Sequence, residues 1–248
     1  MCFELDSSPP IPIIRGAALS HEDLVLEGRD GNRFAAFGAY PDQATGIGIV
    51  VLPDVRGLYR FYEELALRFA ERGYTAIAFD YFGRTAGVEK RDGDFEYMEH
   101  VKQTTTEGVQ SDVAAVVAQL RETCSVIFTV GFCFGGRNSW LASAGGHVLA
   151  GAIGFYGRPG PANDGTPGPI QRAGEMRAPV LALQGGDDPG IPVEDSQAFD
   201  RALSEAGVEH EVVIYEGAPH SFFDRKYTEF AEASADAWKR VQAFVTGT

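Results

Sequence analysis

The sequence predicts an α/β fold in which a mostly parallel central sheet carries helices on both faces. Two observations support this prediction. Apolar runs such as residues 46–52 (GIGIVVL) and 74–80 (YTAIAFD) lack the alternation of half-exposed strands, so they fit strands covered on both faces. Segments with helical periodicity separate these runs, and a helix between two such strands forms a right-handed crossover that makes the strands parallel.

The expected elements follow one another along the chain, beginning with a hairpin. An Asp-Gly turn at Asp30 and Gly31 separates two strand-like segments, 22–28 and 33–40. The further expected strands are 46–52, 74–80, 125–131, 148–156, 179–184 and 210–215, and the expected helices are 59–72, 108–121, one directly after Cys133, 193–206 and one from about residue 227.

Residues 1–248 are expected to form one domain, with residues 1–20 as an N-terminal extension that either packs on it or stays mobile. A length of 248 residues suits one large α/β domain, and 44% hydrophobic residues supply a substantial core. The stretch 157–169, rich in Gly and Pro, is expected to be a long loop. This organisation leaves little room for a separate cap domain.

Composition restricts the partners of the protein. The formal net charge of −14 disfavours nucleic acid and anionic membranes, and an anionic substrate would need locally placed arginines. Three cysteines are too few and too oddly spaced for a disulfide framework or a zinc site. The chemistry predicted below requires no metal or organic cofactor. No apolar run reaches the roughly 20 residues of a membrane span, and the N-terminus does not resemble a signal peptide. A cytoplasmic monomer or homodimer is therefore expected.

A cysteine at the end of a predicted strand is the strongest candidate for chemistry. Cys133 lies in VGFCFGG (residues 130–136), a Gly-x-nucleophile-x-Gly turn between a buried strand and a helix. Gly131 and Gly135 remove side chains that would clash in so sharp a turn. The N-terminus of the following helix favours a thiolate, and the backbone N–H of Phe134 points to where an oxyanion would form. An isolated cysteine after a strand is more often a core residue, but this context favours a nucleophile.

Residues that follow two later strands supply a candidate base and acid. In a doubly wound sheet the ligand lies beyond the carboxyl ends of the strands. His220, in EGAPHSFFD, and Asp188, in LQGGDDPGIP, are expected at such ends and could act as base and orienting acid. Asp187 competes for the acid role, and Asp188 could instead be a turn or capping residue. The chain order of nucleophile, acid and histidine is that of the α/β-hydrolase arrangement.

The sequence resembles the dienelactone hydrolases, cysteine-dependent members of the α/β-hydrolase superfamily, from about residue 22 to the C-terminus. The resemblance rests on six motifs in order: LPDVRGL, FDYFGR, GFCFGG, IGFYG, GGDDPGIP and GAPHSFFD. It implies an α/β-hydrolase fold without a large cap and a triad of Cys133, His220 and Asp188. It also implies that Val55 supplies a second N–H to the oxyanion hole, beside that of Phe134.

The resemblance is less complete at the residues expected to bind substrate. The family usually carries a glutamate that interacts with the resting cysteine, and this chain has the shorter Asp54 there. Two arginines bind the substrate carboxylate in the family. Arg84 matches the first, but an aspartate stands in place of the second, so either Arg225 replaces it or the pair is incomplete. Arg84 could equally pair with surface carboxylates, and Tyr156 could either touch substrate or be a buried aromatic residue.

Together these features predict a hydrolase that cleaves an ester or lactone through a thioester acyl-enzyme. In this hypothesis His220 activates Cys133 and later the water, while Asp188 holds the imidazole. The expected partner is a small ester or lactone, either anionic or neutral. The alternatives are a broader carboxylesterase, thioesterase or phosphotriesterase with the same residues, and a non-catalytic binding or redox-sensing protein on the same fold.

Overall fold

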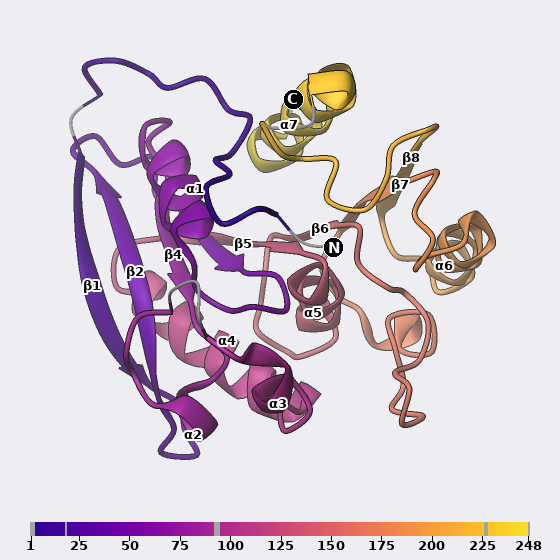
Figure 1. Ribbon diagram of the computed structural model, residues 1–248, viewed down its shortest axis with the longest axis horizontal. Coiled ribbons are helices and arrows are strands. Elements are labelled where there is room, and N and C mark those ends of the chain that lie inside the picture. The colour runs from indigo at the N-terminus through magenta and orange to yellow at the C-terminus, as the bar shows by residue number, and fades with distance from the viewer. Residues whose placement is uncertain (1–2, 18, 92–94, 226–227, 248) are drawn as a thin grey trace.

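The computed structural model describes residues 3–17, 19–91, 95–225 and 228–247 (Figure 1). Its centre is an eight-stranded sheet in the order β1-β2-β4-β3-β5-β6-β7-β8. Strands β3 to β8 are parallel, and β2 pairs antiparallel with both β1 and β4. The strands are β1 (Leu19–Glu27), β2 (Arg33–Pro41), β3 (Ile47–Leu52), β4 (Thr75–Phe79), β5 (Val126–Phe132), β6 (Gly151–Phe155), β7 (Val180–Gly185) and β8 (His210–Tyr215). The predicted fold class is confirmed.

Helices cover both faces of this sheet. Ile49 and Val51 of β3 pack with α1 and α7 on one face, and Val50 and Leu52 pack with α4 on the other. Helices α5 and α6 lie on the α4 side, where they pack on β6 and β7. The helices are α1 (Arg60–Ala70), α2 (Gly83–Ala86), α3 (Tyr97–Val101), α4 (Thr106–Arg121), α5 (Phe134–Ser143), α6 (Val193–Glu205) and α7 (Ala231–Thr246), with 3-10 turns η1 (Ala173–Glu175) and η2 (Thr228–Phe230).

Three local differences separate the structure from the sequence prediction. Strand β6 begins at Gly151 rather than at residue 148, because Val148 has a left-handed backbone with φ 55° that a strand does not accept. Helices α2 and α3 lie between β4 and α4, where no element was expected. Helix α7 begins at Ala231 after the turn η2, and residue 227, where a helix was expected to begin, lies outside the described residues.

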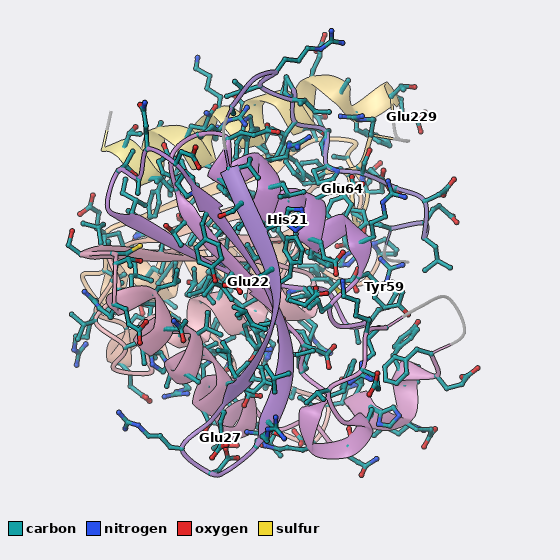
Figure 2. The ribbon with its side chains drawn as sticks, turned by 90° about the vertical axis from the view of Figure 1, so that its left-hand side faces the viewer. His21, Glu22, Glu27, Tyr59, Glu64 and Glu229 are labelled. Atoms are coloured by element: carbon teal, nitrogen blue, oxygen red, sulfur yellow. The ribbon has the colours of Figure 1, made fainter. Side chains whose placement is uncertain are left out.

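The first strand protects one edge of the sheet with charge. Viewed from that edge, β1 crosses the front of the molecule, with Glu22 and Glu27 among its labelled side chains (Figure 2). Both glutamates are exposed, and charged side chains on an edge strand oppose pairing with another chain. Within the described ranges, no helix has both the length and the apolar composition to cross a bilayer.

The described part of the N-terminal extension, residues 3–17, lies against the domain. The side chains of Phe3 and Ile11 are buried in the core shared with α1 and α7. The hydroxyl of Ser7 donates a hydrogen bond of 2.6 Å to the buried carboxylate of Asp224. The extension therefore packs on the domain by apolar and polar contacts.

Candidate active site

The candidate site lies beyond the carboxyl ends of the parallel strands. Leu52 pairs with Gly131 in the sheet register, so β3 and β5 end side by side, and the loop after β3 begins next to Cys133. Asp188 follows β7, and His220 lies in the segment after β8. Because parallel neighbours end at the same edge of a sheet, these segments meet there.

Cys133 occupies a strained turn between β5 and α5. Its backbone has φ 55° and ψ −112°, and a non-glycine residue in such a region costs on the order of 1–3 kcal/mol. A Cβ atom on Gly131 would lie 2.0 Å from the carbonyl oxygen of Gly135, and one on Gly135 would lie 2.1 Å from that of Leu52. The turn therefore needs glycine at both positions, as the sequence pattern predicts.

The histidine and one of the two candidate acids lie in direct contact. The Nδ1 atom of His220 is 2.5 Å from Oδ2 of Asp188. The other oxygen of Asp188 accepts a hydrogen bond of 2.8 Å from the N–H of Gly190, which fixes the buried carboxylate. Asp187 is exposed, and its backbone N–H donates to the carbonyl of Ala218. The structure thus brings Asp188, and not Asp187, to the imidazole.

The electrostatic environment of His220 favours its charged form. Burial lowers the pKa of His220, but hydrogen bonds with Asp188 and Cys133 and the negative charges of both groups outweigh it and raise the pKa to about 9. The imidazole is then protonated at neutral pH, with the carboxylate on one side and the sulfur on the other. This is the charge distribution that a thiolate nucleophile requires.

The loop after β3 uses nearly all its backbone N–H groups to hold its own shape. The N–H of Asp54 donates to the hydroxyl of Tyr62, that of Arg56 to the Asp54 carboxylate, and that of Leu58 to the buried carboxylate of Asp80. Among the described residues, no hydrogen bond uses the N–H of Val55.

Phe134, which directly follows Cys133, has a second backbone N–H group of interest. It is the first residue of α5, where a helix leaves its backbone N–H groups without an intrahelical partner. The described contacts do not occupy this group either. Both N–H groups expected to form the oxyanion hole therefore lack an acceptor among the described hydrogen bonds.

The carboxylate of Asp54 faces an arginine. Its Oδ2 atom lies 2.7 Å from Nη2 of Arg56, and its Oδ1 atom accepts the Arg56 backbone N–H at 2.9 Å. Asp54 is almost fully buried, so the arginine balances a charge that water does not reach. The side chain that replaces the family glutamate is thus part of an ion pair within the loop after β3.

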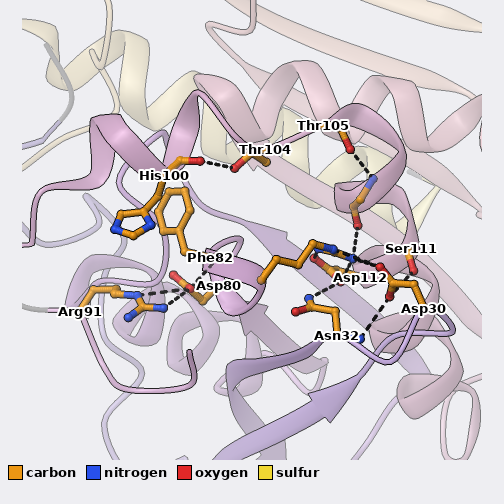
Figure 3. Close-up of polar contacts among 12 residues, drawn as sticks. Asp30, Asn32, Asp80, Phe82, Arg91, His100, Thr104, Thr105, Ser111 and Asp112 are labelled. Carbon is orange, nitrogen blue, oxygen red and sulfur yellow. Dashed lines mark hydrogen bonds and ion pairs between the residues drawn. The ribbon is translucent and has the colours of Figure 1, made fainter. Parts of the chain in front are cut away.

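Arg84 lies apart from these groups. Its guanidinium binds Asp30 and Asp112, at 2.7 Å each, and the carbonyl of Gly108. Figure 3 shows Asp30, Asn32 and Asp112 converging on this network. The geometry agrees with the alternative in which Arg84 pairs with carboxylates, and it ties the hairpin tip to α2 and α4.

Replacement of Arg84 with alanine is expected to lower the free energy of unfolding by about 2 kcal/mol, because it removes the cation from the buried carboxylate of Asp112. Urea denaturation measures this loss. Replacement of Arg172 with alanine is the matched control, because Arg172 pairs with the exposed Glu175. It should lower the free energy of unfolding by less than about 1 kcal/mol. The Michaelis constants for anionic and neutral substrates should change alike in R84A. If the Michaelis constant rose only for substrates that carry a carboxylate, Arg84 would be a substrate-binding residue.

Tyr156 and Arg225 have different surroundings. Tyr156 follows β6, is buried, and its ring centroid is 4.9 Å from that of His220. Arg225 is exposed, and its backbone N–H donates to the carbonyl of Ser8 at 3.4 Å. Tyr156 therefore touches the candidate base, while Arg225 lies beside the N-terminal extension.

Two residues that shape the site were not assigned a role from the sequence. Asp80 accepts the N–H of Leu58 and lies 2.9 Å from Arg91, so it braces the loop after β3. Its place directly after an apolar run marks it in the sequence as a residue at the carboxyl edge of the sheet, but does not indicate this role. Phe3 contacts the residue before Cys133, and nothing in its sequence context indicates this.

Comparisons with known proteins cover most of the chain. The sequence model of the dienelactone hydrolase family matches residues 34–247. A Yersinia pestis protein named "putative carboxymethylenebutenolidase" is 30% identical over 225 residues, which cover 87% of this chain and 84% of that protein. A protein of the same name from Methylorubrum extorquens is 31% identical over 209 residues, which cover 78% and 69%.

Solved structures give the same picture. A Klebsiella pneumoniae protein described as a "putative dienelactone hydrolase" superposes with a TM-score of 0.81 and 28% identity, covering 93% of this chain and 100% of that one. A dienelactone hydrolase-like promiscuous phosphotriesterase from metagenomic libraries shares the fold, with a TM-score of 0.76 and 24% identity, covering 94% and 99%. The family match, the relatives and the fold together establish that this chain belongs to the dienelactone hydrolase family and is a hydrolase of the α/β-hydrolase superfamily.

Proposed function

We propose that the protein hydrolyses a carboxylic ester or lactone by covalent catalysis at Cys133, with His220 as acid and base and Asp188 as the group that orients the imidazole. One observation carries the proposal. The imidazole of His220 lies between a buried carboxylate at 2.5 Å and the side chain of a cysteine in a strained, glycine-flanked turn. Nucleophilic catalysis requires this order of groups.

In the acylation step the thiolate of Cys133, paired with the imidazolium of His220, attacks the carbonyl carbon. The resulting oxyanion accepts hydrogen bonds from the N–H groups of Val55 and Phe134, which have no competing partner among the described contacts. As the tetrahedral intermediate collapses, the C–O bond to the leaving group breaks, and His220 gives its proton to the departing alkoxide. A thioester and a neutral imidazole remain.

In the deacylation step His220 takes a proton from water, and the hydroxide adds to the thioester carbonyl. Collapse of the second intermediate expels the Cys133 thiolate, releases the carboxylic acid and leaves the imidazolium in place. Asp188 keeps Nδ1 of His220 hydrogen-bonded through both steps, so Nε2 faces the reacting atoms.

For the substrate, we propose a small ester or lactone whose recognition does not require a carboxylate. Arg84 is engaged by Asp30 and Asp112, and Arg56 by Asp54, so neither guanidinium is placed to bind an anion beside Cys133. Of the two arginines expected to bind a substrate carboxylate, Arg84 and Arg225, the exposed Arg225 remains the candidate. The promiscuous phosphotriesterase among the fold relatives adds aryl phosphotriesters to the compounds worth assaying.

The test compares hydrolysis of cis-dienelactone, a neutral aryl acetate and an aryl phosphotriester, each with and without prior treatment with iodoacetamide. We expect turnover of the neutral ester that alkylation abolishes, with cis-dienelactone no better a substrate. A strong preference for the lactone would mean that an anion-binding group survives, with Arg225 as its first candidate. Turnover that resists complete alkylation of Cys133 would refute the cysteine mechanism.

The pKa of His220 provides a test that does not depend on substrate. In NMR spectra of protein labelled in histidine, the ring resonances of His220 should titrate with a midpoint at about pH 9. The raised pKa means that the imidazolium is present below this pH and is lost above it, so acid catalysis by His220 should decline as the pH passes about 9. In Cys133→Ala the midpoint should move down, because a hydrogen bond and a negative charge are removed. An unchanged midpoint would show that the cysteine does not interact with the histidine.

A further inference from the structure

The third residue of the chain is buried among side chains that flank the candidate nucleophile and base. The ring of Phe3 stacks on Phe61 at 3.9 Å between centroids and packs at 6.4 Å against both Phe132 and Tyr156. Phe132 directly precedes Cys133, and Tyr156 contacts the ring of His220. Phe3 is only 3% exposed.

Polar contacts fix this segment to the loop that carries one oxyanion donor. A guanidinium nitrogen of Arg56 donates to the carbonyl oxygen of Phe3. The same guanidinium also lies 2.7 Å from the carboxylate of Asp54, and Asp54 and Arg56 are the residues directly before and after Val55. The position of the Phe3 backbone is thereby coupled to the turn that presents the N–H of Val55.

A second set of contacts fixes the segment to the loop after the histidine. The hydroxyl of Ser7 donates to Asp224 at 2.6 Å, and both residues are buried. The N–H of Arg225 donates to the carbonyl of Ser8. Residues 3–8 therefore bridge the oxyanion loop and the loop that follows His220.

We propose that Phe3 is a specificity-determining residue, which forms an aromatic wall beside Cys133 and limits the size of the group that reaches the sulfur. The inference rests on the proposed cysteine chemistry and adds the substrate class: esters or lactones with a short or compact acyl part. A longer acyl chain would have to displace a ring that is stacked on Phe61 and anchored through its own carbonyl by Arg56. Removing the ring opens space without removing any group that takes part in the reaction.

The first measurement compares the alkylation rates of Cys133 with iodoacetamide and with the bulkier N-benzyl iodoacetamide, followed by mass spectrometry of the peptide that contains Cys133. In the full-length protein, Phe3→Ala should raise the ratio of the alkylation rate with N-benzyl iodoacetamide to that with iodoacetamide by about tenfold or more. Leu5→Ala is the matched control, because Leu5 lies in the same segment but is 54% exposed, and its ratio should equal that of the wild type.

The second measurement is the ratio of kcat/KM for p-nitrophenyl hexanoate to that for the acetate, which should rise in Phe3→Ala by a similar factor. A folded Phe3→Ala protein with both ratios unchanged would overturn the proposal, as would equal acceleration with the small and the bulky reagent. A changed ratio of alkylation rates without turnover of any ester would support the role of Phe3 in limiting access to Cys133 and would refute the proposed function. If Phe3→Ala does not fold, Phe3→Leu should shift the alkylation ratio in the same direction by a smaller factor, and no shift would overturn the proposal.

Discussion

Cys133→Ala is expected to lower kcat/KM for the neutral aryl ester by about 10⁴-fold or more, because the nucleophile is removed and only the oxyanion donors and binding contacts remain. The fold should persist. Alanine is smaller than cysteine, and the turn is held by the glycines on either side of it. Circular dichroism and thermal melting would establish that the variant is folded before rates are compared.

Cys124 supplies the matched control. It is a buried cysteine in the core beneath α4 and precedes the amino end of β5, whereas Cys133 follows the carboxyl end of that strand. Cys124→Ala should therefore retain turnover within a few-fold of the wild type. If folded Cys133→Ala kept more than about a tenth of the wild-type rate, the covalent mechanism would be wrong and another group would have to activate water.

Asp188→Asn is expected to lower kcat by about 10³- to 10⁴-fold, since an amide can present its NH₂ group to Nδ1 and so favour the wrong imidazole tautomer. The substitution also removes a negative charge that raises the pKa of His220. In Asp188→Asn the titration midpoint of the His220 ring resonances should therefore fall together with kcat. A variant that lost activity only through a disturbed structure would not be expected to show this shift in the midpoint.

Asp187→Asn tests the competing acid in the same way. The Asp187 side chain is exposed, and the described hydrogen bond of this residue comes from its backbone. Turnover and the His220 midpoint should both remain close to wild type in Asp187→Asn. The reverse pattern, with Asp187→Asn inactive and Asp188→Asn active, would exchange the roles of the two residues.

The parallel sheet was predictable because its strands are short, apolar and separated by helical segments. Residues 48–52 and 75–79 are buried on both faces, and the sequence shows this directly as apolar runs without alternation. The turn at Cys133 was equally readable. Only glycine fits where a Cβ would lie about 2 Å from a carbonyl oxygen, so a local steric requirement leaves a local pattern.

Choices between chemically equal residues required the tertiary structure. Asp187 and Asp188 are adjacent and identical in type, and the path of the loop after β7 decides which carboxylate meets His220. Arg84 stands at a sequence position expected to bind substrate, yet its guanidinium forms ion pairs with Asp30 at the hairpin tip and with Asp112 of α4. Side-chain partners far apart in the sequence leave no periodic signal by which they could be paired.

Thus the sequence by itself determined the fold class, the order along the chain of the strands and of the helices other than α2 and α3, and the glycine-flanked turn at the cysteine, since these depend on neighbouring residues and on hydrophobic periodicity. Only the tertiary structure decided the acid partner of His220, the ion pairs of Arg84 with Asp30 and Asp112, and the place of Phe3 beside Phe132. Each of these depends on where separate segments of the chain meet in space, and burial and charge pairing fix those meeting points only when the whole domain is folded.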